Sequence, residues 1–311
     1  EGVEATEANT VSGDYALARP FSYVTRAAGD FDSVEKEQLV AAFVAYITES
    51  EEGLGAVEAA GGIVDYDEAR PWEEIREDHP IVDQDNSGLE LLTGGSTSVV
   101  KTLEAALQAF QPESGYFSYK VDNTGSSAGY KRTLGDEKDS ATRADIGFAS
   151  REFHPSDEDT SGALLSGVYC LDAVVAVVEA GNDMDNLSAA QLIAIFTGQV
   201  TNWEDVPSVK EETLEGEIHV YTRDSSSGTR EAFEDKGGFA GELTDLAVEV
   251  SSNGDMAVKV GQDPQAIGYV SLTTDFAASN LKPLAYEGVE ATEANTVSGD
   301  YALARPFSYV T

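Results

Sequence analysis

The sequence contains few of the residues from which disulfides and metal sites are built, and no long apolar run. It has one cysteine, Cys170, and three histidines in 311 residues, so no disulfide forms within the chain and no metal-ligand spacing is present. Cys170 lies in the apolar stretch VYCLDAVVAVV, where we expect a buried, unreactive thiol. A membrane-spanning helix needs roughly 18–20 apolar residues, and no run reaches that length. The sequence therefore predicts no metal, no cofactor and no transmembrane helix.

Positive charge is also scarce. There are 19 lysines and arginines against 57 aspartates and glutamates, which gives a net charge of −38. With 41% hydrophobic residues the chain is typical of a folded protein rather than a disordered acidic one. Such a surface resembles that of proteins from extreme halophiles such as halophilic archaea, because molar salt shortens the Debye length to about 3 Å and screens self-repulsion. It argues against nucleic acid partners, whose phosphates it would repel. An ordinary acidic protein remains the alternative.

The first 25 residues are repeated at the end of the chain. Residues 1–25 and 287–311 both read EGVEATEANTVSGDYALARPFSYVT. Unconstrained drift would not leave two copies identical over this length, so the duplication is recent, engineered, or one overlap of a longer repeating chain. The period of 286 residues is close to one sizeable unit. We therefore read the sequence as a circle.

Helical and strand patterns alternate along most of the chain. Residues 33–48 have an amphipathic pattern with Ser33 as N-cap, and residues 81–88 are polar and read as a linker. Further helices are expected at 53–60, after 98 and at 188–196, and strands at 89–92, 116–121, 145–149, 167–180, 217–222 and 267–271. This alternation predicts an α/β fold with mostly parallel sheets, in one large domain or two lobes.

Three turns share one design, in which a strand is followed by a loop of Gly, Ser and Thr and then by a helix. They are residues 94–98, 125–129 and 225–229. A helix N-terminus presents free backbone N–H groups and a partial positive charge, and glycines let a ligand approach closely. Arg223 stands four residues before Ser227 and could add a charged fork. Each loop alone is typical of an ordinary N-cap, but three together indicate an anion site.

Six motifs resemble the phosphate-binding component of ABC phosphate importers. In order they are TGGSTSV, NTGSSAG, ADIGFASRE, IFTGQVTNW, TRDSSSGTREAF and AIGYV, between residues 93 and 270. The resemblance implies a two-lobed, periplasmic-binding-protein-like fold of type II, with mostly parallel sheets flanked by helices and a hinge between the lobes. It covers nearly the whole chain, but in permuted order.

The resemblance also implies a domain order. Residues 15–62 look like the family's C-terminal end, placed before its N-terminal start. We expect a duplicated segment at 1–25, the C-terminal part of lobe 1 plus a linker at 26–88, the N-terminal part of lobe 1 at 89–152, lobe 2 at 153–286, and a strand crossing back to lobe 1 at 287–311. The chain is then a circular permutant or one period of a tandem array. Because the two copies of the crossing strand compete for one position, we expect one to fill it and the other to be displaced or to pair with a neighbour.

The family's ligand positions can be carried over by motif. They imply phosphate contacts from Thr97, Ser98, Ser126, Ser150, Arg151, Arg223, Ser227, Gly228 and Thr229. Arg151 departs from well-known members, which have there an aspartate that accepts the proton of hydrogen phosphate and rejects sulfate. Phosphate selectivity therefore loses its usual acceptor, and a salt bridge to the acidic surface is the other interpretation of Arg151.

The resemblance implies an extracellular, cell-surface binding protein without enzymatic activity, which delivers phosphate to an ABC permease in the membrane. A hydrolase is the weaker alternative: GSSAG fits G-x-S-x-G with Ser127 as nucleophile, but His154 and His219 do not stand where a base is needed. A structural role is the stronger alternative, because the duplication could support self-association into an extracellular filament or surface array.

Overall fold

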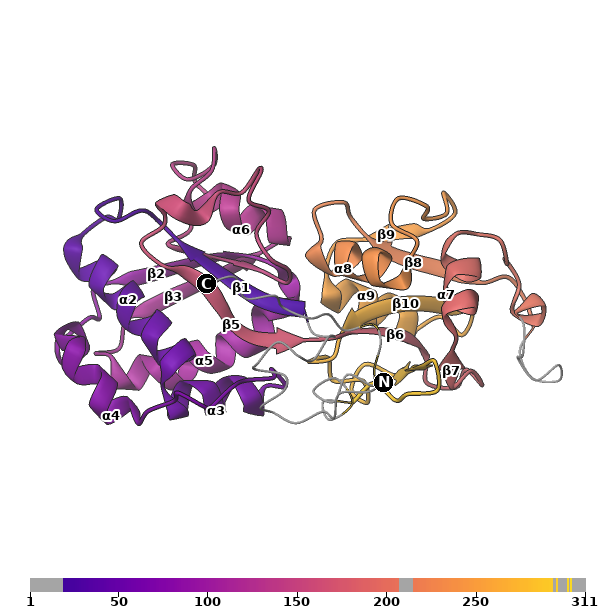
Figure 1. The fold of residues 1–311 in the computed structure, drawn as a ribbon, viewed down its shortest axis with the longest axis horizontal. Helices are drawn as coiled ribbons and strands as arrows, with labels where there is room; N and C mark the ends of the chain where they lie inside the picture. Colours follow the sequence, from indigo (N-terminus) through magenta and orange to yellow (C-terminus); the bar gives the residue numbers. More distant parts are fainter. Residues whose placement is uncertain (1–18, 207–214, 293–294, 296–300, 302, 304–311) are drawn as a thin grey trace. The chain divides into compact units, whose positions relative to one another are not determined.

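The computed structural model describes residues 19–206, 215–292, 295, 301 and 303. They form two compact α/β units, each with its own hydrophobic core (Figure 1). Unit 2 is Pro20–Leu171, and unit 1 contains the described residues from Asp172 onward. The boundary lies 19 residues later than the expected one at 152/153, because the strand that ends at Asp172 pairs within the sheet of unit 2. Within the described ranges, no helix combines the length and apolar character that a membrane span requires.

The sheet of unit 2 is mixed rather than mostly parallel. Its order is β3-β2-β4-β1-β5, and β2 runs parallel to both β3 and β4. Strand β1 runs antiparallel to β4, with Ser22 opposite Ala149. It also runs antiparallel to β5, since Thr25 N donates to Leu165 O (2.9 Å) and Leu164 N to Arg26 O (2.8 Å). The strands are β1 (Arg19–Thr25), β2 (Glu90–Gly95), β3 (Ser118–Asn123), β4 (Ile146–Ala149) and β5 (Ser166–Asp172).

The helices of unit 2 begin where polar caps stand before apolar stripes. The predicted helix at 33–48 is confirmed as α2, and the Ser33 side chain accepts a hydrogen bond from Lys36 N. Its face with Leu39, Phe43 and Ile47 is buried in the core. The helices are α2 (Val34–Glu49), α3 (Glu51–Ala59), α4 (Trp72–Ile75), α5 (Val100–Glu113) and α6 (Ser126–Thr133), with 3-10 turns at Arg76–Asp78, Pro80–Asp83, Thr97–Val99 and Thr160–Gly162.

Residues 81–88, which read as a polar linker, are packed into unit 2. Ile81 and Val82 are 1% and 3% exposed. The buried side chain of Asn86 donates hydrogen bonds to Ile81 O (2.8 Å) and Ser114 O (2.9 Å). Asn86 thus satisfies backbone groups in the interior, while Asp83, Gln84, Asp85 and Ser87 face water as a polar linker would.

The sheet of unit 1 is also mixed, in the order β11-β6-β10-β8-β9. Strand β8 runs parallel to β9 and β10, whereas β6 is antiparallel to β10 and β11. The single strand predicted at 167–180 is two strands, β5 and β6, which belong to different sheets and are separated by Ala173. The elements are β6 (Val174–Glu179), β7 (Asn186–Leu187), α7 (Ala189–Phe196), a 3-10 turn (Trp203–Asp205), β8 (His219–Arg223), α8 (Gly228–Gly237), β9 (Val248–Val250), α9 (Asn253–Gly261), β10 (Ala266–Ser271), β11 (Leu281–Pro283) and β12 (Ala285–Tyr286), which pairs with β7.

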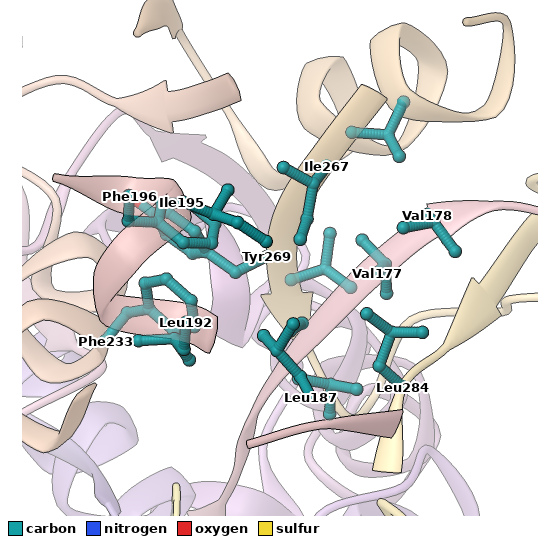
Figure 2. Packing of buried hydrophobic residues seen from close by; sticks show 14 of the residues in the cluster. Val177, Val178, Leu187, Leu192, Ile195, Phe196, Phe233, Ile267, Tyr269 and Leu284 are labelled. Atoms are coloured by element: carbon teal, nitrogen blue, oxygen red, sulfur yellow. The ribbon is translucent and has the colours of Figure 1, made fainter. Parts of the chain in front are cut away.

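Three aromatic side chains, those of Phe196, Phe233 and Tyr269, lie among aliphatic ones in the core of unit 1 (Figure 2). The rings of Phe233 in α8 and Tyr269 in β10 are stacked, with centroids 4.2 Å apart. Phe196, at the end of α7, meets Phe233 edge-on at 4.9 Å. These contacts fix α8 against the sheet and so determine where its N-terminus lies.

The two copies of the repeat contribute different parts to the fold. Strand β1 comes from the first copy, whereas Tyr301 and Leu303 of the second copy are 0% and 1% exposed in the core of unit 1. The strand in the sheet of unit 2 therefore comes from residues 19–25, whereas we expected the crossing strand at 287–311. Residues 305–311, the second copy of that strand, lie outside the described residues.

Candidate functional site

In unit 2 the predicted ligand residues follow the carboxyl ends of three parallel strands. Loops after β2, β3 and β4 contain Ser96 to Ser98, Ser126 and Ser150 respectively. Carboxyl ends of parallel strands meet at one edge of a sheet, and this edge is where open α/β folds bind ligands. The topology therefore brings Ser96 and Ser150, which are 54 positions apart in the sequence, into one cluster.

Three serine hydroxyl groups lie in contact at this edge. Ser96 Oγ donates to Ser150 Oγ (2.9 Å), and Ser150 Oγ lies 3.2 Å from Ser126 Oγ. Ser126 Oγ also accepts a hydrogen bond from Ser150 N (3.1 Å). All three residues are at most 3% exposed. Ser96 was not among the predicted ligands, although its position directly after Gly94 and Gly95 could have indicated it.

Two glycines allow these loops to approach one another. Gly95 has φ of +126°, and a Cβ there would lie 1.9 Å from Phe148 O. A Cβ on Gly147 in β4 would lie 2.0 Å from Gly129 O in α6. Both positions therefore require glycine, and the second lets the first turns of α6 pack directly against β4.

Two helical segments begin beside the serine cluster. The 3-10 turn Thr97–Val99 leads into α5, with the Ser96 side chain accepting a hydrogen bond from Ser98 N (3.2 Å). Ser98 is buried and Thr97 is half-buried. Helix α6 begins at Ser126, after Gly125 N donates to Gly95 O (2.8 Å). The N–H groups of these first turns complement a negative charge.

Arg151 is held by an acidic partner seven residues away. Its Nη1 and Nη2 donate to the two carboxylate oxygens of Glu158 at 2.6 and 3.0 Å, and both side chains are about nine-tenths buried. Nη2 also reaches Ser127 Oγ at 3.4 Å. Burial raises the pKa of Glu158, but the hydrogen bonds from Arg151 and from His154 N outweigh it and leave that pKa below its usual value. The ion-pair interpretation of Arg151 thus has a defined partner in the structure.

We expect Glu158→Gln to lower the free energy of unfolding by about 1–3 kcal/mol at pH 7, because the buried guanidinium loses its charged acceptor. A carboxyl whose folded pKa is lowered stabilises the fold fully above its unfolded pKa, about 4.3, and loses this effect as pH falls through the folded value. The difference between wild type and variant should therefore shrink below about pH 4. Urea denaturation at pH 7 and pH 3.5 measures it.

Glu152→Gln is the matched control, since Glu152 is exposed and its change should stay within about 0.5 kcal/mol. A Glu158→Gln variant as stable as this control at pH 7 would show that the pair does not stabilise the fold.

In unit 1 the predicted arginine stands at the end of β8. Arg223 is 1% exposed, and its Nη2 donates to Ser251 O at 3.4 Å and lies 3.9 Å from Asp224 Oδ2. Arg223 N donates to the Tyr269 hydroxyl (3.1 Å), which also contacts Thr222 Oγ1 (2.9 Å). Burial raises the pKa of Tyr269 to about 12, so this hydroxyl stays neutral and fixes the end of β8.

The N-terminus of α8 follows directly. The Ser227 side chain caps the helix by accepting from Arg230 N (3.3 Å). Gly228 and Thr229 form the first turn, and all three residues are buried. This is the third predicted loop, and it places a helix N-terminus and Arg223 at the carboxyl edge of the parallel strands β8, β9 and β10.

The described geometry gives little support to a hydrolase site or a metal site. Ser127 receives its hydrogen bond from Arg151, whereas His219 lies in unit 1 with its Nδ1 2.7 Å from Asp263 Oδ2. Cys170 is buried, as predicted. In the described part of the chain, no three His, Cys, Asp or Glu side chains are grouped so that they could hold a metal ion.

Sequence comparison finds a family and several relatives. The model of the PBP superfamily domain matches residues 76–311. "Phosphate-binding protein PstS 2" of Streptococcus agalactiae is 29% identical over 206 residues, which are 66% of this chain and 61% of the relative. The protein of the same name from Streptococcus pneumoniae is 30% identical over 206 residues, 66% of this chain and 62% of the relative. The chain thus spans about three fifths of the length of the curated relatives that it matches.

Solved structures resemble the chain in fold. A phosphate ABC transporter substrate-binding protein with bound phosphate from Clostridium perfringens is 29% identical, with a TM-score of 0.61 over 70% of this chain and 84% of that one. An ABC-type phosphate transport receptor from Vibrio cholerae is 28% identical, with a TM-score of 0.52 over 70% of this chain and 85% of that one. The predicted α/β fold of type II is therefore confirmed, with two mixed sheets of partly parallel strands.

Proposed function

We propose that this chain, which belongs to the PBP superfamily, is a non-enzymatic, extracytoplasmic binding protein that captures inorganic phosphate for an ABC permease. The observation that carries the proposal is the set of three Ser/Thr-rich loops, each opening a helical segment at the carboxyl edge of parallel strands. The relatives named for phosphate binding and the related structure with bound phosphate support it.

We assign the oxygen atoms of phosphate to two sets of protein groups. Unit 2 supplies hydroxyl and N–H groups, and unit 1 supplies the Arg223 guanidinium and the first turn of α8. The set is Thr97, Ser98, Ser126, Ser150, Arg151, Arg223, Ser227, Gly228 and Thr229, to which we add Ser96 because its hydroxyl bonds to Ser150. For Arg151 we assign the side of the guanidinium that faces Ser127. Both Nη1 and Nη2 donate to Glu158, and Nη1 also donates to Glu152 O.

The net charge of −38 does not oppose this ligand. N–H dipoles and a guanidinium act on an anion over a few ångströms, while molar salt reduces the reach of the distant acids to about 3 Å. Calorimetric titration of phosphate into the protein in molar KCl, with sulfate as competitor, tests the function. Saturable binding of phosphate is expected, and a folded protein that gives no binding heat would contradict it. Competition by sulfate measures what the missing aspartate at position 151 costs in selectivity.

We also propose that the protein is adapted to high salt. Self-repulsion among the acids should destabilise the fold at low ionic strength, where the Debye length is about 10 Å, and much less in molar salt. The melting temperature is expected to rise by at least about 5 °C between 0.1 M and 2 M KCl. Thermal melts followed by circular dichroism measure this. A melting temperature that stays level or falls with salt would rule out the adaptation.

The duplication favours a second, structural candidate function. Two identical segments of 25 residues could join neighbouring copies into an extracellular filament or surface array. Light scattering and electron microscopy in molar KCl distinguish the two functions. Filaments would favour the structural role, and a monomer that binds phosphate would exclude it.

A further inference from the structure

The described residues of the repeat come from different parts of its two copies. The second copy enters the core of unit 1 as far as Leu303, and the first copy enters the sheet of unit 2 from Arg19. The offset of 286 residues makes Leu303 the equivalent of Leu17. In the numbering of the repeat, the last described residue of the second copy and the first described residue of the first copy are therefore separated by a single position, 18 or 304.

Strand β1 occupies a position with defined requirements. It lies between β4 and β5, with the pairing Ser22–Ala149 on one side and Thr25 N to Leu165 O on the other. Phe21 and Val24 are both 0% exposed. The position thus requires two strand edges to be paired and specific apolar side chains to be buried.

Residues 305–311 meet each of these requirements. They read RPFSYVT, the sequence of β1, so Phe307 stands for Phe21 and Val310 for Val24. Every side chain and every backbone donor or acceptor that β1 presents to β4 and β5 is present in the second copy. The intrinsic affinity of the position for the two segments is therefore the same.

Residues shortly before 305–311 are held in unit 1 of the same chain, which favours insertion of this segment into its own chain rather than into a neighbouring copy. Leu303, two residues earlier, is held in the core of unit 1. Tyr301 lies in that core against the backbone of Ala176 in β6, and only Ala173 separates β6 from β5, the neighbour of β1. A short tether gives an effective concentration in the millimolar range, about a thousandfold above micromolar protein in solution.

We propose that the β1 position of unit 2 is a binding site for an extended RPFSYVT segment, and that residues 305–311 of the same chain take it when residues 19–25 leave. The first copy holds the site in the native chain because it continues directly into Arg26. The Arg26 guanidinium is fixed by bonds to Asp30 O (2.7 Å) and Lys138 O (2.7 Å).

Paired substitutions in the full chain test this proposal. Phe21→Asp places a carboxylate in the core and should expel the first copy, and Phe307→Asp does the same to the second. Each single variant should melt within about 3 °C of wild type, whereas the double variant should melt about 10 °C or more lower. Substitution of one copy for the other predicts this non-additivity, and additive effects of the two changes would contradict it. A Phe21→Asp variant that melts as low as the double variant would overturn the proposal, and so would a comparable loss for Phe307→Asp alone.

A disulfide trap identifies the chain that supplies the strand. Ser308 is the equivalent of Ser22, which faces Ala149, so Ala149→Cys with Ser308→Cys can cross-link only when the second copy sits in the same register. In the Phe21→Asp background we expect this cross-link within one chain on a non-reducing gel. The same cysteines with Phe21 intact should cross-link at least about tenfold less, and Ala149→Cys alone is the control for the native Cys170. Cross-linked dimers, or no cross-link in a folded Phe21→Asp protein, would overturn the assignment to the same chain. The outcome does not depend on phosphate binding.

Discussion

Arg223→Ala is expected to weaken phosphate binding about 30-fold or more. Among the described residues that we assign to the ligand, Arg223 is the one arginine in unit 1. It lies at the carboxyl edge of the sheet and is 1% exposed. Truncating one partner of a buried charged hydrogen bond costs about 2–5 kcal/mol, and each 1.4 kcal/mol is a factor of ten in affinity. Calorimetric titration in molar KCl measures the loss. Arg223→Lys keeps the charge without the planar fork, so its affinity should fall between those of wild type and alanine variant.

Arg143→Ala is the matched control for this experiment. The Arg143 guanidinium pairs with Asp32 at 2.9 Å on the surface, and its side chain is 42% exposed. It should bind phosphate with the affinity of wild type. Thermal melts of both variants separate lost binding from lost folding. If a folded Arg223→Ala protein binds phosphate as tightly as the Arg143→Ala control, Arg223 is not a ligand.

Phe233→Ala is expected to lower the free energy of unfolding by about 3–5 kcal/mol, because it leaves a cavity in the aromatic core of unit 1. Phe233 is 0% exposed, and its ring meets those of Tyr269 at 4.2 Å and Phe196 at 4.9 Å (Figure 2). This loss is a large part of the 5–15 kcal/mol that typically stabilises a domain. Urea denaturation in molar KCl measures it.

Val248→Ala serves as the control, since Val248 in β9 is 52% exposed and its truncation should change stability by at most about 0.5 kcal/mol. The Phe233→Ala variant also reports on the proposed anion site, because Phe233 packs against Tyr269, whose hydroxyl accepts the hydrogen bond of Arg223 N. A Phe233→Ala protein with the stability of the Val248→Ala control would show that the aromatic contacts do not support the fold.

The three loops that we propose to bind phosphate were predictable as strand–loop–helix turns from the sequence because their chemistry is local. Glycine, serine and threonine between a strand and a helix determine a tight turn and an N-cap, as Ser227 and Ser188 show. The buried helix face of α2 was predictable for the same reason, since its period of 3.6 residues is a property of one segment. Nothing distant had to be known for either prediction.

Other features depended on partners that the sequence does not reveal. The run from Gly167 to Ala180 is continuously apolar, and only the structure separates it into β5 and β6 in two sheets. Strand β1 runs antiparallel to β4, so the sheet of unit 2 is mixed rather than mostly parallel. Because β5 pairs with β1, unit 2 extends to Leu171 instead of ending at 152. Glu158, the partner of Arg151, stands in an acidic stretch where composition favours a solvated surface. Tertiary pairing decided each of these cases.

The contact among Ser96, Ser126 and Ser150 has a consequence for how the protein would sense its surroundings. A hydroxyl group can turn about its C–O bond, so it can donate or accept without gaining or losing a proton. The other groups that we assign to the ligand are backbone amides, further serine and threonine hydroxyls and guanidinium groups, which keep one protonation state across the ordinary range of pH. The residues proposed to hold the anion therefore carry no acid–base switch of their own, and acidity would be read through the protonation of the anion itself.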